Sequence, residues 1–231
     1  MPTLDDTSTP VPLPRPPHHP RRSFIQRLAG ISALFAAGGA PARAFGQEAQ
    51  GGADPWLARV TGKHKQVFDA PEVNHGFPSI FAATYLRTMN ETYKLAPGEA
   101  HAVVVLRHFA MPLALTDEVW AKYKVGAMMN VTDPATKAPA LRNIFYKSRE
   151  GDIPFPEASI EKVLQMPATF VACGAALQVL SARAAEGAGV DAATAKSDWE
   201  KGIIPGIFVA PSGVLAVGRA QERGCGYCFA G

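Results

Sequence analysis

The chain has 231 residues, 47% of them hydrophobic, and a formal net charge of +3 from 23 basic and 20 acidic side chains. The basic excess lies within the first 44 positions, so the remainder is close to neutral and offers no basic surface for a nucleic acid. That remainder is long enough for one domain with its own core, and neither a repeat nor a change of composition marks a second domain.

The N-terminal segment has the organisation of a secretory signal. A pair of arginines, Arg21 and Arg22, precedes an apolar stretch over residues 29–40, and small residues around Ala44 offer a cleavage site. The arginine pair before Ser-Phe-Ile resembles a twin-arginine export signal. The apolar stretch is well short of the roughly 20 residues that a membrane-spanning helix needs, so we expect a signal peptide rather than an anchor.

Cleavage after Ala44 would leave no membrane span and would deliver the folded protein to the periplasm. Residues 1–44 are then the signal, residues 45–60 a flexible leader and residues 61–231 the folded domain. The Gly, Ala and Gln-rich composition of the leader supports this division.

Short apolar runs alternate with helical patterns along the domain. We expect strands over residues 65–69, 102–106, 169–173, 207–209 and 225–230. The intervening segments predict helices that begin near residues 78, 116, 159, 174, 191 and 213. This alternation favours an α/β fold with three α/β/α layers and a mainly parallel five-stranded sheet.

Two further segments stand out. Phe77, Phe81, Tyr85 and Met89 recur every four residues, which is typical of a helix face that packs on the core. Residues 132–156 contain several prolines and no periodicity, and a loop of this length in a compact domain is usually functional or part of an interface. We expect this loop either to cover the site or to build a subunit contact.

Cys173 ends an apolar run that leads directly into an alanine-rich helical pattern. This predicts a cysteine at a helix N-terminus, where unpaired N–H groups and the helix dipole favour a thiolate. A reactive cysteine is one interpretation. The other is a small buried residue that fills the strand–helix junction, because free cysteine is among the most buried residue types.

Further candidates lie where the other strands end, because ligands of open α/β sheets bind beyond the carboxyl ends of the strands. There His108 could act as a base for Cys173, and Arg107 could hold an anion. In the alternative interpretation, His108 is a satisfied polar residue at a strand end and Arg107 pairs with a surface acid. The remaining candidates for ligand binding are Asn74, His75 and Ser212, with Asp69 close by.

Metal binding and disulfide bonding receive less support. A zinc site from Cys173 and His108 with His75 or Asp69 lacks any tight ligand spacing, so we expect neither a metal nor another cofactor. Cys225 and Cys228 fall in an expected strand, where three residues span about 10 Å, beyond the roughly 7 Å Cα separation that a disulfide allows. An odd number of cysteines leaves at least one free thiol.

Three segments, Phe170–Gly174, Val209–Val214 and Ala220–Tyr227, resemble the C-terminal half of the DsrE/DsrF-like family. The resemblance implies a three-layer α/β/α fold and a homotrimer or homohexamer. It also implies that Cys173 corresponds to the cysteine that several branches use in sulfur relay. Export departs from the better-known branches, which relay sulfur in the cytoplasm with a partner protein.

The sequence thus supports two functions. The first is a thiol-dependent sulfur carrier or sulfurtransferase-like protein in which Cys173 carries a persulfide and exchanges it with a donor or acceptor protein. The alternative is a non-catalytic oligomeric protein of the periplasm that binds a small ligand or a metal. A carrier requires an exposed Cys173, whereas a binding protein tolerates its replacement by serine.

Overall fold

A computed structural model describes residues 54–231 of the chain. The segments expected to be the export signal, its cleavage site and most of the leader lie outside the described residues, so export to the periplasm stays a prediction. Within residues 54–231, no helix is both long enough and apolar enough to cross a membrane.

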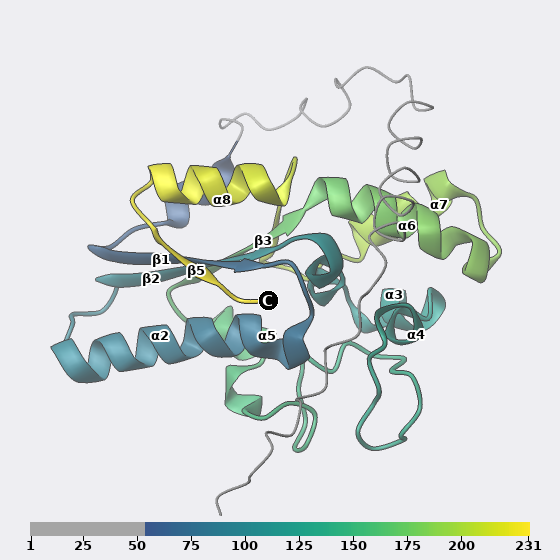
Figure 1. Cartoon of the computed structure of the whole chain (residues 1–231), viewed down its shortest axis with the longest axis horizontal. Coiled ribbons are helices and arrows are strands. Elements are labelled where there is room, and N and C mark those ends of the chain that lie inside the picture. Colours follow the sequence, from purple (N-terminus) through teal and green to yellow (C-terminus); the bar gives the residue numbers. More distant parts are fainter. Residues whose placement is uncertain (1–53) are drawn as a thin grey trace, which may run out of the picture. The chain divides into compact units, whose positions relative to one another are not determined.

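Five parallel strands form a single sheet with the order β4-β3-β2-β1-β5. Figure 1 shows the sheet between helices on its two faces, which confirms the predicted α/β fold with a parallel sheet. The strands are β1 (His64–Ala70), β2 (Ala100–Leu106), β3 (Ala168–Cys173), β4 (Phe208–Ala210) and β5 (Gly226–Phe229).

The middle strand, β2, is buried at every position. Its continuous apolar run suits a strand with helices over both faces. The two edge strands are the shortest, and each leaves apolar side chains exposed, namely Val209 on β4 and Tyr227 and Phe229 on β5.

The helices of the described region include every one that the sequence predicts, together with short 3-10 turns. They are η2 (Pro55–Arg59), η3 (Asn74–Gly76), α2 (Phe77–Tyr93), η4 (His108–Ala114), α3 (Asp117–Lys122), α4 (Val125–Met129), η5 (Pro156–Ala158), α5 (Ile160–Val163), α6 (Gly174–Ala188), α7 (Ala192–Lys201) and α8 (Gly213–Glu222).

Two apolar clusters hold the layers together. On one face of the sheet, Trp56 of η2 and Ala216 of α8 pack with the valines of β1, β2 and β3. On the other face, α2 packs through Ile80 and Leu86 against the opposite side chains of the same strands. The side chains of the four-residue repeat from Phe77 to Met89 are only partly buried. The face of α2 that packs on the sheet is formed instead by residues next to them in the sequence, such as Ile80 and Leu86.

Helices α3, α4, α6 and α7 lie beyond the carboxyl ends of the strands (Figure 1). Between α4 and η5, residues 130–155 form no helix or extended strand. This long connection returns to the same end of the sheet, so the carboxyl ends of β1 and β2 face a wall built from α4 and the connection.

Candidate functional site

An ionic cluster occupies the carboxyl ends of β1 and β2. Asp69, which is 4% exposed, accepts hydrogen bonds from Arg107 Nε at 2.6 Å and Nη2 at 2.9 Å. Tyr227 OH of β5 donates to the same carboxylate at 2.9 Å. The hydrogen bond from Arg107 to Asp69 raises the pKa of the guanidinium. Of the two interpretations of Arg107, the structure therefore shows the ion pair with an acid.

Cys173 lies at the N-cap of α6, as the sequence predicts. Its Sγ accepts a hydrogen bond from the Ala176 N–H at 3.3 Å. The residue is 6% exposed, and it forms no disulfide with Cys225 or Cys228, which are also free. The sulfur is thus placed where a negative charge is favoured, but it has little access to solvent.

Ser212 caps the neighbouring helix α8, because its Oγ accepts a hydrogen bond from the Leu215 N–H at 3.2 Å. The next residue, Gly213, permits a close approach of two chain segments. A Cβ at Gly213 would lie 2.3 Å from Arg107 Cβ, so any larger residue would push α8 away from the end of β2. Both features position the helix, and Ser212 Oγ is engaged in the cap.

His108 points away from this cluster. Its ring is exposed, stacks on Phe109 with 4.1 Å between ring centroids, and has Nδ1 3.9 Å from Glu72 Oε1. No contact between His108 and Cys173 occurs in the structure. Among the described residues, no group of three or more His, Cys, Asp or Glu side chains is arranged to hold a metal ion.

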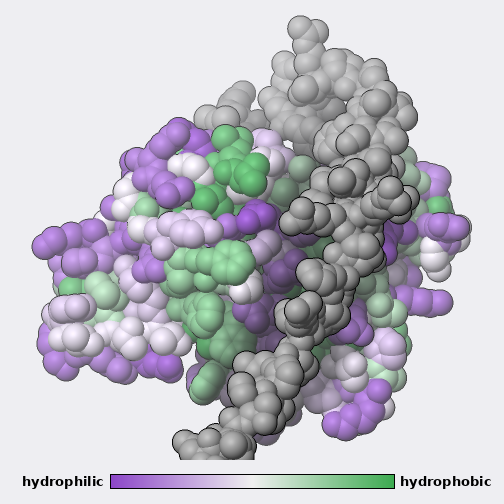
Figure 2. All heavy atoms as spheres, in the orientation of Figure 1, coloured by the Kyte–Doolittle hydropathy of each residue, from purple (hydrophilic) through white to green (hydrophobic). Residues whose placement is uncertain are grey.

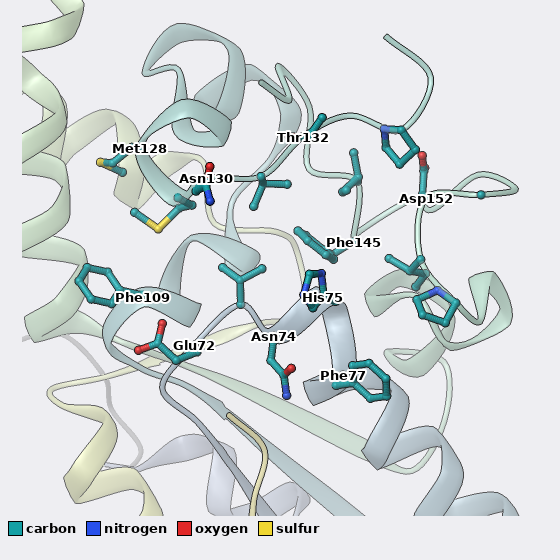
Figure 3. Close-up of a pocket in the computed structure, with 18 of the residues that line it drawn as sticks. Glu72, Asn74, His75, Phe77, Phe109, Met128, Asn130, Thr132, Phe145 and Asp152 are labelled. Carbon is teal, nitrogen blue, oxygen red and sulfur yellow. The ribbon is translucent and has the colours of Figure 1, made fainter. Parts of the chain in front are cut away.

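A large pocket opens next to these residues, with a volume of about 1200 Å³ (Figure 3). It lies beyond the carboxyl end of β1, between η3, η4, α4 and the connection over residues 130–155. The lining residues are Glu72, Val73, Asn74, His75, Phe77, Phe109, Met128, Met129, Asn130, Val131, Thr132, Pro134, Ile144, Phe145, Gly151, Asp152, Ile153, Pro154 and Arg183.

The backbone that carries His75 into the pocket is unusual. Asn74, His75 and Gly76 have φ values of 40°, 50° and 84°, three successive left-handed conformations. Such conformations are costly for residues other than glycine and concentrate at functional sites. Figure 3 shows His75 near the middle of the pocket beside Phe145, whereas the side chain of Asn74 points away and donates to the carbonyl of Ala230 at 3.3 Å.

Gly76 is required here for a second reason. A Cβ on this residue would lie 2.9 Å from Cδ1 of Phe145. Phe145 therefore sits directly against the backbone of η3, and this contact joins the connection over residues 130–155 to the end of β1.

Asn143 fixes the middle of that connection. The side chain is 1% exposed, and its Nδ2 donates to the carbonyls of Leu113 at 2.9 Å and Leu115 at 2.8 Å. Its own backbone N–H donates to Asp117 Oδ1 at 2.8 Å. These bonds hold the adjacent Phe145 in the pocket wall.

Arg142 ties together the two ends of the pocket wall. It donates to both oxygens of Asp152, at 2.6 and 2.7 Å, and its Nε lies 3.0 Å from Asp133 Oδ2. All three side chains are largely buried. Because Asp133 and Asp152 stand at opposite ends of the connection, we call this group, Asp133–Arg142–Asp152, the clasp.

The residues expected from the sequence therefore divide into two places. Asn74 and His75 line the large pocket, whereas Arg107, His108, Cys173 and Ser212 do not. Most of the pocket was not predicted from the sequence, including its aromatic and methionine side chains and the clasp. Besides the place of Asn74 and His75 after the first strand, the long aperiodic stretch over residues 132–156 was the signal that pointed to it.

Comparisons with known proteins assign neither a family nor a function to the chain. No family model matches the chain, and no curated protein matches it. Among solved structures, a protein of unknown function from Methanobacterium thermoautotrophicum, MTH1491, is similar, with 14% sequence identity and a TM-score of 0.35. The match covers 72% of this chain and 98% of that protein. A likeness at this level assigns neither a family nor a function.

Proposed function

We propose that this protein binds a small organic molecule in the pocket beyond the carboxyl end of β1. The observation that carries the proposal is the pocket itself, about 1200 Å³ in volume and lined by a majority of apolar side chains. Ligand sites of proteins are concave, mostly apolar and supplied with a few polar groups that fix orientation. Open α/β sheets also bind ligands at the carboxyl ends of their strands.

The pocket is built in a way that supports a binding role. Phe145 is held against η3 by the Asn143 hydrogen bonds, and the clasp fixes both ends of the wall. A wall that is ordered before the ligand arrives lowers the entropic cost of binding. This is the small-ligand form of the second function that the sequence supports, and it would operate in the periplasm if the N-terminal segment directs export.

A fluorescent apolar probe tests the proposal. N-phenyl-1-naphthylamine, a neutral amine that carries a naphthyl and a phenyl group, should bind saturably and with one-to-one stoichiometry. Met128→Trp places a large ring in the pocket and should weaken this binding about tenfold or more, the loss of roughly 1.4 kcal/mol or more of contact energy. Met166→Trp is the matched control, because Met166 is an exposed methionine that does not line the pocket.

Circular dichroism and thermal unfolding of both variants confirm that they fold. Saturable binding that only Met128→Trp weakens supports the proposal. An absence of saturable binding to the native protein, or equal binding by the native protein and Met128→Trp, would show that the pocket is not a ligand site.

One observation favours a second candidate, the sulfur carrier. The sulfur of Cys173 accepts a hydrogen bond from the Ala176 N–H at the start of the 15-residue helix α6. The thiolate would attack the outer sulfur of a polysulfide, form an S–S bond as Cys173 persulfide, and release the shortened polysulfide. Its burial and its absence from the pocket lining place this function second.

Intact-mass measurement after incubation with polysulfide tests the sulfur carrier. The expected result for a carrier is a gain of one or more sulfur atoms that reductant reverses and that Cys173→Ser abolishes, while the Cys225→Ser/Cys228→Ser double variant retains it. Labelling confined to Cys225 and Cys228, or no labelling of Cys173, would exclude this function and leave ligand binding as the single candidate.

A further inference from the structure

The acidic side chains of the pocket have charged or ionisable partners within the protein, whereas the basic side chains do not have such partners among residues 54–231. Asp152 lines the wall, but Arg142 and the N–H of Arg149 occupy both of its carboxylate oxygens. Glu72 lies at the margin of the pocket beside Phe109 (Figure 3), with His108 as its ionic neighbour. The two acidic side chains of the pocket therefore already face positively charged or ionisable groups of the protein.

The basic side chains of the pocket, Arg183 and His75, lack such partners in the described part of the chain. Arg183 extends from α6 into the lining and is exposed, and its side chain makes no hydrogen bond or ion pair with another residue of the range 54–231. His75 also lacks a hydrogen bond in that range, although its left-handed backbone holds the ring inside the pocket. A guanidinium and an imidazole are thus available to a ligand.

An unpaired guanidinium offers a defined chemistry. Its planar set of N–H donors matches the two oxygens of a carboxylate or the oxygens of a sulfonate, and such charge-assisted hydrogen bonds are stronger than neutral ones. Apart from Asn74, Asn130, Thr132 and Gly151, the rest of the lining consists of phenylalanine, methionine, isoleucine, valine and proline side chains, which favour an apolar body.

We infer that the pocket takes an amphipathic organic anion, a molecule with an aromatic or aliphatic body and one carboxylate or sulfonate group. Arg183 binds the anionic group, His75 donates a hydrogen bond to the ligand, and the aromatic and methionine side chains enclose the apolar body. This inference rests on the proposed binding function and specifies the chemical class of its ligand.

Two probes that differ by one sulfonate group provide the test. 8-Anilinonaphthalene-1-sulfonate is N-phenyl-1-naphthylamine with a sulfonate added, so the effect of the anion is measured on one ring system. Arg183→Gln should weaken sulfonate binding about tenfold, as expected for loss of a charge-assisted hydrogen bond, and should leave binding of the neutral probe unchanged. His75→Gln should produce a smaller loss in the same direction.

Two further variants separate the effect of Arg183 on sulfonate binding from the effect of the protein's net charge. Arg87→Gln removes an exposed arginine of α2 that does not line the pocket, and it should leave both probes unaffected. Glu72→Gln removes the exposed acid at the margin, and it should strengthen binding of the sulfonate alone.

The outcomes separate the preference for an anion from the binding function itself. Loss of sulfonate binding in Arg183→Gln, with the neutral probe retained, establishes the anion preference. Equal losses for both probes, an equal effect of Arg87→Gln, or saturable binding of the neutral probe alone would overturn the anionic class while the binding function stands. Failure of both probes to bind the native protein would remove the binding function and this inference with it.

Discussion

Asp69 joins three strands through one carboxylate. Arg107, directly after β2, and Tyr227 of β5 both donate to it, and the group is nearly inaccessible to solvent. Asp69→Asn would leave the Arg107 charge without its partner. Removal of one member of a buried ion pair costs about 3–5 kcal/mol, and the 27% exposure of the Arg107 side chain reduces that cost. We expect the free energy of unfolding to fall by about 2–4 kcal/mol, measured by urea denaturation.

The comparison with Tyr227→Phe makes this prediction specific. That change removes one hydrogen bond to Asp69 but keeps the ion pair with Arg107, so the loss should be about 1 kcal/mol. A loss in Asp69→Asn no larger than that of Tyr227→Phe would mean that the ion pair contributes little to stability.

Single residues were predictable where the signal is local. The cap positions of Cys173 and Ser212 follow from the residues beside them, an apolar run before each and a helical pattern after each. The pairing of Arg107 with Asp69 depends instead on the register of β1 against β2, which aligns residues 36 positions apart. The sequence alone left that pairing open, with anion binding as the other interpretation.

At the scale of elements, the central strands β2 and β3 were predictable because each contains a continuous apolar run next to a helical pattern. The edge strand β5 (Gly226–Phe229) falls within the expected stretch, although it is shorter. The apolar face of α2 was harder to assign. We predicted the core-facing side of α2 from its large aromatic side chains, but the smaller Ile80, Ala83 and Leu86 are the buried ones.

The position of the connection over residues 130–155 in the fold could not be predicted from a sequence pattern. Its length and prolines indicated a functional segment, but its place in the fold is determined by contacts that are distant in sequence. Asn143 bonds to Leu113 and Leu115, and Phe145 packs on Gly76. No periodicity reveals such contacts, so the pocket could not be predicted although the importance of the segment could.

For the whole molecule, self-association remains a prediction that the family resemblance implies. Apolar side chains gather over α8 and beside β5 on the face shown in Figure 2, and those of Val214, Leu215, Tyr227 and Phe229 are exposed. A homotrimer or homohexamer could cover such side chains.

The stability of the whole fold should respond to acid through the clasp. Burial acts to raise the pKa of Asp152, but hydrogen bonds from Arg142 and the Arg149 N–H outweigh it and lower that pKa. Burial likewise opposes the lowering of the pKa of Asp133, which the N–H groups of Ala135 and Thr136 and the charge of Arg142 bring about. The folded chain therefore keeps these carboxylates ionised at a pH where the unfolded chain protonates them.

The sign of the pH dependence follows from these lowered pKa values. The stability that the clasp supplies is complete above the ordinary carboxyl pKa of about 3.9 and is lost as the pH falls through the lowered values. Asp152→Asn should cost about 2–4 kcal/mol at neutral pH and should flatten the acid limb of a plot of unfolding free energy between pH 7 and pH 2. Glu91→Gln, an exposed change on α2, should preserve that limb. An acid limb in Asp152→Asn as steep as that of the native protein would show that the clasp is not what couples this fold to acid.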